Sequence, residues 1–476
     1  MGTSANPDRI DPRPTLERRL GVFDGTLLTI GSVVGTGIFL TSDDVARALP
    51  DTALFLLVWL VGGALTLAGA LTYAELGAMY PRAGGIYHFL KEAYGPLWGF
   101  LYGWTSFLVI MSGGIAALAV GFGDSLGGLV PFFASHRIVW NVRVAEISWS
   151  VSSSQLAAVV AIVLLTAVNH FGLRSGAWTQ NVLTMLKAAA LGALIGCGLY
   201  VAAPELTAAT ATSPSASTTP TGLGILAPFG VAMVAVLWTF DGWYGLTFSA
   251  GEMRKPERDL PRALCFGTIA IIVLYVLTNI VYLRALPLET MATTERVGEA
   301  AAIVLFGAIG GNVVAVIILL SILGCLASTI LYSSRIYMPM AVDGVFFRSA
   351  ATIHPKFRVP VGSLWCQSLW AIVLTLSGRY EQLFTFAVFA SLIFHAATAC
   401  SLFVLRRRRP DVPRPYRVWG YPVLPFLFIA GCLLIVATAL VETPRESFAG
   451  LGLVALGVPA YAFWRRQARA GRRSFG

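Results

Sequence analysis

The chain has few charged residues, and this scarcity excludes an ordinary soluble protein. Only 12% of its 476 residues are charged, whereas 56% are hydrophobic. Soluble domains have about 25% charged residues and cannot bury an apolar excess of this size around one core. The sequence therefore requires a lipid bilayer around most of its surface.

Cysteine is also scarce, and the chain lacks the clusters that metal or covalent chemistry needs. The six cysteines lie in or beside apolar stretches without the spacing of metal ligands, so we interpret them as core thiols. No paired acids, and no nucleophile with its base, are expected at one membrane depth, which disfavours a membrane enzyme. We expect no cofactor and no metal.

Long hydrophilic segments are missing too, so one membrane domain is expected over residues 21–465. Residues 1–20 lack the charged-then-apolar order of a signal peptide and are interpreted as a tail, as are the basic residues 466–476. The longest loops are 123–153 and 203–223, of which the second is rich in Ser, Thr and Pro and is expected to be flexible.

Apolar stretches long enough to cross a hydrocarbon core of about 30 Å recur along the whole chain. They predict an all-α polytopic membrane protein of about twelve transmembrane helices. The stretches are 22–41, 52–79, 95–122, 155–173, 178–202, 224–249, 263–286, 302–332, 360–377, 382–405, 421–441 and 448–464.

The net charge of +10 would suit nucleic acid only if the basic residues shared one folded face. Instead, with a cytoplasmic N-terminus, 26 of the 34 Lys and Arg residues fall in segments predicted to lie inside. This is the positive-inside pattern, with the basic groups beside anionic lipid. We therefore expect no nucleic-acid partner, both termini in the cytoplasm, and a location in the plasma membrane, or in the inner membrane of a bacterium.

Two of the apolar stretches are interrupted at their centres. The first reads GSVVGTGIF over residues 31–39, and the sixth reads LWTFDGW over residues 237–243. Glycine in a helix interior costs about 1 kcal/mol, and unwound backbone at membrane depth is tolerated where it lines a cavity. Broken helices at matching positions indicate an inverted-repeat transporter, with repeats at 21–203 and 224–406 and extra helices at 421–465. The alternative for the first stretch is close packing of helices on glycine.

An unwound helix offers free N–H groups at the start of one half and free C=O groups at the end of the other. An amino acid carries a carboxylate and an ammonium on adjacent atoms. The first can bind N–H groups from Gly35 to Ile38, and the second can bind carbonyls of both breaks. The Trp238 ring either closes a side-chain pocket or serves as a packing or interface residue.

Five motifs in chain order resemble the amino acid-polyamine-organocation family, and most closely its L-amino acid transporter branch. They are GSVVGTGIF, YAELGAMYPRAGGIYHFLKEAYG, LWTFDGWYGLTFSAGEMRKPERDLPRAL, SSRIYMPMAVDG and FVLRRRRPDVPRPYRVWGYP. The resemblance implies a five-plus-five inverted repeat with broken helices one and six, the LeuT fold. It also implies that the amino acid binds at Val34, Gly35, Thr36, Gly37, Ile38, Trp238, Thr239, Phe240 and Asp241.

Lys187 is a lysine predicted to lie inside a membrane helix. A charge at the bilayer centre costs about 2.5 to 3.5 kcal/mol on insertion scales, which favours a partnered, functional lysine over one that extends to the surface. In the family that the motifs resemble, a lysine here occupies the sodium site of sodium-coupled relatives and links the first helix to the fifth and eighth. The resemblance therefore implies sodium-independent transport.

Other polar residues in the motifs leave alternatives open. Asp241 precedes the second half of the sixth stretch and is either its N-cap or a group that reads a cationic or polar substrate. Glu75 and Glu252 are interpreted as capping or gate residues paired with arginines. His395 is interpreted as a hydrogen-bonded structural residue, with proton transfer as the alternative.

The resemblance also directs the functional expectation. Ala327 stands where several relatives carry a polar amide, so a pocket contact is expected to be missing. Residues 123–153 contain no cysteine, so no disulfide-linked heavy subunit is expected. We expect a sodium-independent exchanger of L-amino acids. The alternatives are a proton-coupled amino-acid or polyamine permease of the same fold, and an amino-acid sensor.

Overall fold

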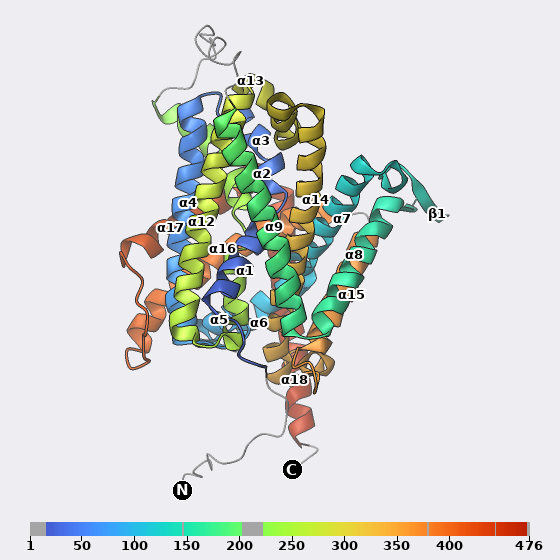
Figure 1. Ribbon diagram of the computed structural model, residues 1–476. Coiled ribbons are helices and arrows are strands. Elements are labelled where there is room, and N and C mark those ends of the chain that lie inside the picture. The colour runs from blue at the N-terminus through green and yellow to red at the C-terminus, as the bar shows by residue number, and fades with distance from the viewer. Residues whose placement is uncertain (1–15, 145–146, 202–221, 378–379, 443, 474–476) are drawn as a thin grey trace.

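The chain folds into a bundle of long helices (Figure 1). The computed structural model describes residues 16–144, 147–201, 222–377, 380–442 and 444–473. In these residues, 11 helices are long and apolar enough to span a membrane. The stretch expected at 360–377 forms a shorter apolar helix, Val361–Ser377. The all-α polytopic fold class is thereby confirmed.

The elements follow the apolar stretches in order. The first half of the chain contains α1 (Val22–Val33), α2 (Gly37–Leu40), α3 (Ser42–Ala48), α4 (Thr52–Met79), α5 (Ile86–Tyr94), α6 (Pro96–Thr105), the π-helical η1 (Ser106–Ile110), α7 (Met111–Leu129), η2 (Pro131–Phe133), β1 (Ile138–Val144), β2 (Ile147–Ser152), α8 (Ser153–His170) and α9 (Leu173–Tyr200). The second half contains η3 (Gly222–Ile225), α11 (Leu226–Thr239), η4 (Trp243–Glu252), α12 (Pro256–Ala285), α13 (Leu288–Met291), α14 (Val297–Val342), η5 (Arg348–Ala351), α15 (Val361–Ser377), α16 (Tyr380–Arg408), α17 (Val423–Glu442) and α18 (Pro444–Arg473). Within α14, Gly307 has a φ of 73° and separates two helical parts.

The first helix lies in the centre of the bundle, where α12, α9, α14 and η4 contact it. Glycine makes the contact between α1 and α12 close on both sides. A Cβ added at Gly267 would lie 2.7 Å from the Thr29 Cβ, and one at Gly25 would lie 2.9 Å from the Ala263 Cβ. Small residues of this kind let helix backbones approach in a membrane. The small residues therefore allow α1 to pack closely against α12.

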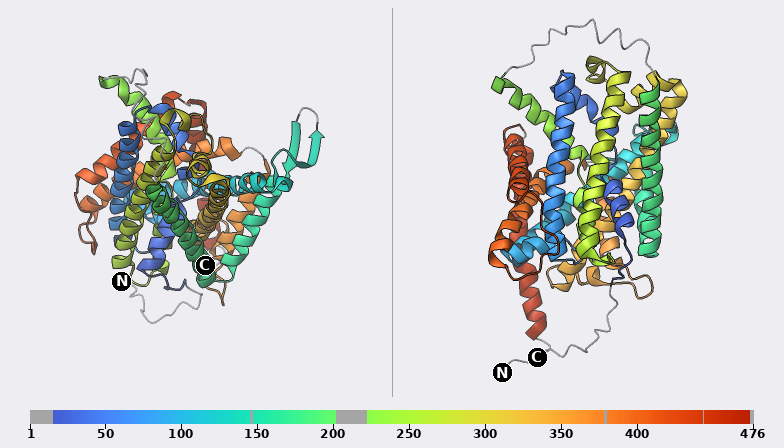
Figure 2. Two further views of the ribbon diagram at one scale, coloured as in Figure 1. Left: turned by 45° about the horizontal axis from the view of Figure 1, so that its top comes forward. Right: turned by 60° about the vertical axis from the view of Figure 1, so that its left-hand side comes forward.

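One element departs from the expected all-helical pattern. Residues 123–153 were expected to be a loop outside the membrane, and β1 and β2 within this segment pair as an antiparallel hairpin. The hairpin projects sideways from the N-terminal end of α8 (Figure 2). Apolar and polar residues alternate over most of both strands, which is the period of a strand with two different faces.

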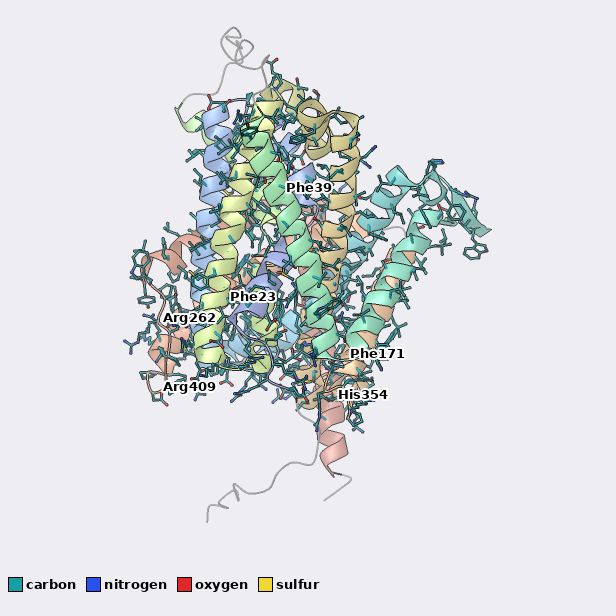
Figure 3. The ribbon with its side chains drawn as sticks, viewed as in Figure 1. Phe23, Phe39, Phe171, Arg262, His354 and Arg409 are labelled. Atoms are coloured by element: carbon teal, nitrogen blue, oxygen red, sulfur yellow. The ribbon has the colours of Figure 1, made fainter. Side chains whose placement is uncertain are left out.

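The chain enters α1 and leaves α18 at the same end of the bundle, which we call the terminal end (Figure 1). Arg262, Arg409 and His354 lie toward this end, whereas Phe39 lies toward the opposite end (Figure 3). We call the opposite end the far end. The hairpin lies toward the far end.

Candidate functional site

The first helix is interrupted where its glycines cluster. Helix α1 ends at Val33, Val34 is extended with φ −70° and ψ 90°, and α2 begins at Gly37. A Cβ added at Gly37 would lie 2.8 Å from the Thr239 Cγ2 and 3.0 Å from the Thr239 Cα. Glycine at position 37 is therefore required by the close approach of the sixth span.

The sixth span is interrupted at the same place in the bundle. Helix α11 ends at Thr239, and the 3₁₀ helix η4 begins at Trp243 after Gly242, which has a φ of 102°. The Ser32 hydroxyl donates a hydrogen bond to the Gly242 carbonyl at 3.0 Å. A Cβ at Gly242 would lie 2.6 Å from the Ser32 carbonyl oxygen. The two breaks therefore touch each other.

The carbonyl groups freed by the first break are bound by side chains from three other helices. The Lys187 ammonium on α9 donates to the carbonyls of Gly31 at 2.7 Å and Val34 at 2.6 Å. Tyr275 on α12 donates to the Val33 carbonyl at 3.1 Å, and the Cys325 thiol on α14 donates to the Ser32 carbonyl at 3.1 Å. Lys187 is 1% exposed, so its side chain does not reach the membrane surface.

A cavity of about 570 Å³ lies against both breaks. Of the nine residues expected to bind substrate, six line it: Gly35, Thr36, Gly37, Trp238, Thr239 and Asp241. From the breaks, the lining continues along α7 through Ala117 and Gly121, and along α11 through Val234. These residues lie on the far-end side of the breaks, because α7 runs toward the hairpin and α11 enters the bundle from the far end (Figure 2).

The other three expected residues are not part of the cavity lining. Ile38 is fully buried, and the Val34 side chain is 1% exposed although its carbonyl binds Lys187. The ring of Phe240 packs against Trp59 and Tyr275, with centroids 6.3 and 5.0 Å away. These three side chains pack into the protein interior, on the side of the breaks that faces away from the cavity.

Several cavity residues were not expected from the sequence. Tyr244, Cys325, Thr329 and Tyr332 line the cavity on the sides of η4 and α14. The position of Ala327 differs from the expectation as well, because its side chain is buried in a cluster with α7 and α8 and lies outside the lining. The sequence signal for this side of the site is the spacing of Cys325, Thr329 and Tyr332, which are four and three residues apart and therefore lie on one helical face.

Asp241 is exposed to the cavity. The N-cap of η4 is Gly242, so the aspartate does not occupy the capping position. Its carboxylate accepts a weak hydrogen bond from the Tyr244 hydroxyl at 3.4 Å. Among the described residues, no lysine or arginine forms an ion pair with it. The cavity therefore contains the Asp241 carboxylate, which has no cationic partner among the residues that the structure describes.

Buried ion pairs join the helices on the terminal side of the breaks. Both carboxylate oxygens of Glu252 accept from the Arg335 guanidinium at 2.9 Å, and the two side chains are 0% and 1% exposed. Glu75 accepts from Arg406 at 2.6 Å, which joins α4 to α16. The expected pairing of both glutamates with arginines is confirmed. Removing one partner of the Glu252–Arg335 pair would leave a buried charge unpaired, at a cost of about 3 to 5 kcal/mol.

A second set of contacts lies at the terminal end, outside the candidate spans. Lys91 on α5 and Asp343, which follows α14, form an ion pair at 2.5 Å, and Tyr87 also donates to Asp343. Burial, together with the Lys91 charge, lowers the pKa of His88 to about 4, so this imidazole is neutral at pH 7. The α5 segment thereby adds a further layer between the cavity and the terminal end.

His395 lies behind the second break rather than in the cavity. Its Nδ1 forms a 2.8 Å hydrogen bond with the Tyr73 hydroxyl, and its ring lies 4.4 Å from the Tyr244 ring centroid. The expected hydrogen bond is confirmed. It joins α4 to α16 at the level of the site.

Membrane-length helices around a cavity at two broken spans define a polytopic membrane protein with an internal site. The chain belongs to the amino acid permease family, which it matches over residues 20–454. It is 30% identical over 449 residues to the serine/threonine exchanger SteT of Bacillus subtilis (strain 168). The aligned residues cover 94% of this chain and 96% of the relative. It is 27% identical to the mouse b(0,+)-type amino acid transporter 1, covering 91% of this chain and 85% of the relative. It is also 27% identical to the human cystine/glutamate transporter, covering 94% and 85%.

Proposed function

We propose that this permease is a sodium-independent exchanger of L-amino acids that binds its substrate at the two breaks. The observation that carries the proposal is the Lys187 ammonium, which donates to two carbonyls of the first break. A sodium ion at this position would bind the same kind of oxygen atoms. The buried Lys187 ammonium occupies that position and repels a further cation, so no sodium is needed.

The substrate is placed against the six lining residues of the breaks. Its carboxylate binds N–H groups at the start of α2, where Gly35, Thr36 and Gly37 line the cavity. Its ammonium binds near the end of α11, where carbonyls and the Asp241 carboxylate are available. The side chain then lies between Trp238 and Thr329. A hydroxyl amino acid suits this mixed apolar and polar surface, and one relative is named a serine/threonine exchanger.

The proposal includes the orientation and organisation of the chain. The clustering of basic residues supports a terminal end in the cytoplasm, with the cavity continuing toward the outside. Residues 21–203 and 224–406 are proposed as the inverted repeats, each beginning with a broken span, and residues 421–465 as additional helices. The proposal also includes transport without a disulfide-linked heavy subunit, because residues 123–153 contain no cysteine.

The test is exchange in liposomes that contain the purified protein. Labelled serine, threonine, leucine and arginine are offered outside vesicles that are either empty or loaded with unlabelled amino acid, in sodium and in choline buffer at one pH. We expect uptake of at least one amino acid that requires internal substrate and is equal in the two buffers. Uptake that needs sodium, or that is as fast into empty vesicles, would contradict the proposal.

Asp241 favours a second candidate, a proton-coupled amino-acid or amine permease. Its carboxylate faces the cavity without a cationic partner among the described residues, so it can bind a substrate amine or take up a proton. The same vesicles decide between the two functions when an inward proton gradient is imposed. Accumulation into empty vesicles that collapses with a proton ionophore would favour coupling, and it would replace the exchange proposal.

A further inference from the structure

The hairpin of β1 and β2 is not used by the proposed transport cycle, because it lies at the edge of the bundle beside α8 (Figures 1 and 2). Its base is firmly held. The Ser153 amide donates to the Arg137 carbonyl at 2.9 Å, and the Ser153 hydroxyl donates to the Ala134 carbonyl at 3.0 Å. Ser152 and Gln155 form a capping box that begins α8. The hairpin therefore keeps a fixed orientation relative to α8.

The strand register separates two faces. Trp140 is paired with Val151, and Asn141 is paired with Ser150. Residues directly opposite each other in a hairpin share a face, and successive residues alternate between faces. One face therefore carries Trp140 and Val151, and the other carries Asn141 and Ser150. The register pairs Val142 with Trp149 further along the strands, so the apolar sequence pattern continues.

The apolar residues of this region are exposed to an unusual degree for a soluble loop. Trp140 is 48% exposed and Phe132, which precedes β1, is 54% exposed, whereas Val151 on the Trp140 face is 7% exposed. Ile138 is 55% exposed, but it is paired with Ser152 beyond a β-bulge and is therefore not counted with the Trp140 face. The Arg137 guanidinium lies over the Phe132 ring, 4.3 Å from its centroid. Tryptophan and arginine beside exposed apolar side chains are the combination that proteins place at the boundary between hydrocarbon and headgroups.

The position of α8 fixes the depth of the hairpin. The exposed residues Leu156, Val160 and Leu164 recur every four residues along the outside of α8 and form a continuous lipid-facing stripe. Leu156 follows Ser152 by four residues, a rise of roughly 6 Å along the helix axis. The headgroup layer is roughly 5 to 7 Å thick on each side of the bilayer. The base of the hairpin therefore lies at headgroup depth and is continuous with the lipid-facing surface.

We propose that the two strands β1 and β2 lie in the lipid headgroup layer at the far end, with their Trp140 face toward the acyl chains and their Asn141 face toward water. The bilayer is the partner favoured by the continuity with α8. The hairpin then acts as a lateral anchor that fixes the height and tilt of α8. The side-chain amide of Gln155 donates a hydrogen bond to the Thr375 carbonyl, so the hairpin also supports α15.

The experiment uses the full-length protein in lipid nanodiscs, with 5-fluorotryptophan in place of tryptophan. The ¹⁹F resonance at position 140 is assigned by its loss in Trp140→Phe. A matched reporter on the opposite face is supplied by Asn141→Trp. Relaxation is measured with dissolved oxygen, which concentrates in the bilayer, and with a water-soluble gadolinium chelate. We expect oxygen to act several-fold more strongly than the chelate at position 140 and the reverse at position 141.

Two outcomes would overturn the proposal. Equal, strong relaxation by the chelate at both positions would place the hairpin in water. Protection of position 140 from both agents would mean that protein covers this face, and a change on dilution of the protein would identify a second copy as the cover. Neither result depends on whether the protein transports amino acids.

Discussion

Replacing Lys187 by alanine should abolish exchange while the protein still inserts into the membrane. The ammonium is the donor to the carbonyls of Gly31 and Val34, at 2.7 and 2.6 Å, and it joins α9 to the first break. Alanine leaves both carbonyls without this donor at a buried position. The break then loses the group that defines its shape before substrate arrives.

The free-energy cost of Lys187→Ala can be worked out from the two lost hydrogen bonds. A buried carbonyl that loses its partner costs roughly 1 to 3 kcal/mol, so the two together cost roughly 2 to 6 kcal/mol. The void left by the shortened side chain adds to this cost, whereas release of the buried charge reduces it. At about 1.4 kcal/mol for each factor of ten, the binding-competent break becomes about 30-fold to 10⁴-fold less populated.

The assay is substrate binding and exchange in liposomes, measured for the parent, Lys187→Ala and Lys356→Ala in sodium and in choline buffer. Lys356 is the control, and the proposed topology places it on the cytoplasmic side. Its ammonium lies over the Phe357 ring, 5.5 Å from the ring centroid and away from the site. We expect only Lys187→Ala to lose binding, and the parent to be indifferent to sodium. Normal affinity in Lys187→Ala, or a sodium requirement in the parent, would refute the reasoning.

Further predictions concern the glycines and the tryptophan of the cavity. Gly37→Ala places a methyl group 2.8 Å from the Thr239 Cγ2, so overpacking of about 1 to 3 kcal/mol should lower both the melting temperature and uptake. Gly35→Ala meets the Cys325 Sγ at 3.4 Å, an ordinary contact, so only uptake should fall, because the methyl takes cavity space; equal thermal destabilisation of the two variants would contradict this assignment. Trp238→Ala should weaken binding of large apolar amino acids more than of alanine in a competition assay, and an equal loss for all substrates would make the residue purely structural.

Hydropathy predicted the membrane helices well because each span must be apolar over its whole length. It missed the elements that follow other rules. The hairpin has the two-residue alternation of strands within residues that were counted only as a loop. Helix α5 buries Ile86, Phe89, Leu90 and Ala93 at helical spacing, but it is too short to register as a span.

The breaks were predictable from glycine density, whereas the direction of each side chain in them was not. Unwound backbone has no fixed period, so sequence spacing cannot say that Gly35 faces the cavity while Val34 and Ile38 face the protein. The arginine that pairs with each glutamate could not be predicted from the sequence either. Arg406 lies 331 residues from Glu75, and only the packing of α4 against α16 brings them together.

The contact between the two breaks has a consequence for the range of cargo. The Ser32 hydroxyl donates a hydrogen bond to the Gly242 carbonyl, and Gly37 lies against Thr239, so protein atoms connect the two segments directly. A force applied at one break is passed directly to the other through protein atoms. In the proposed transport cycle, a cargo molecule therefore need not bridge both segments for them to move together. The same hinge can serve side chains of different length, and selectivity can change by substitutions along the cavity wall without rebuilding the moving parts.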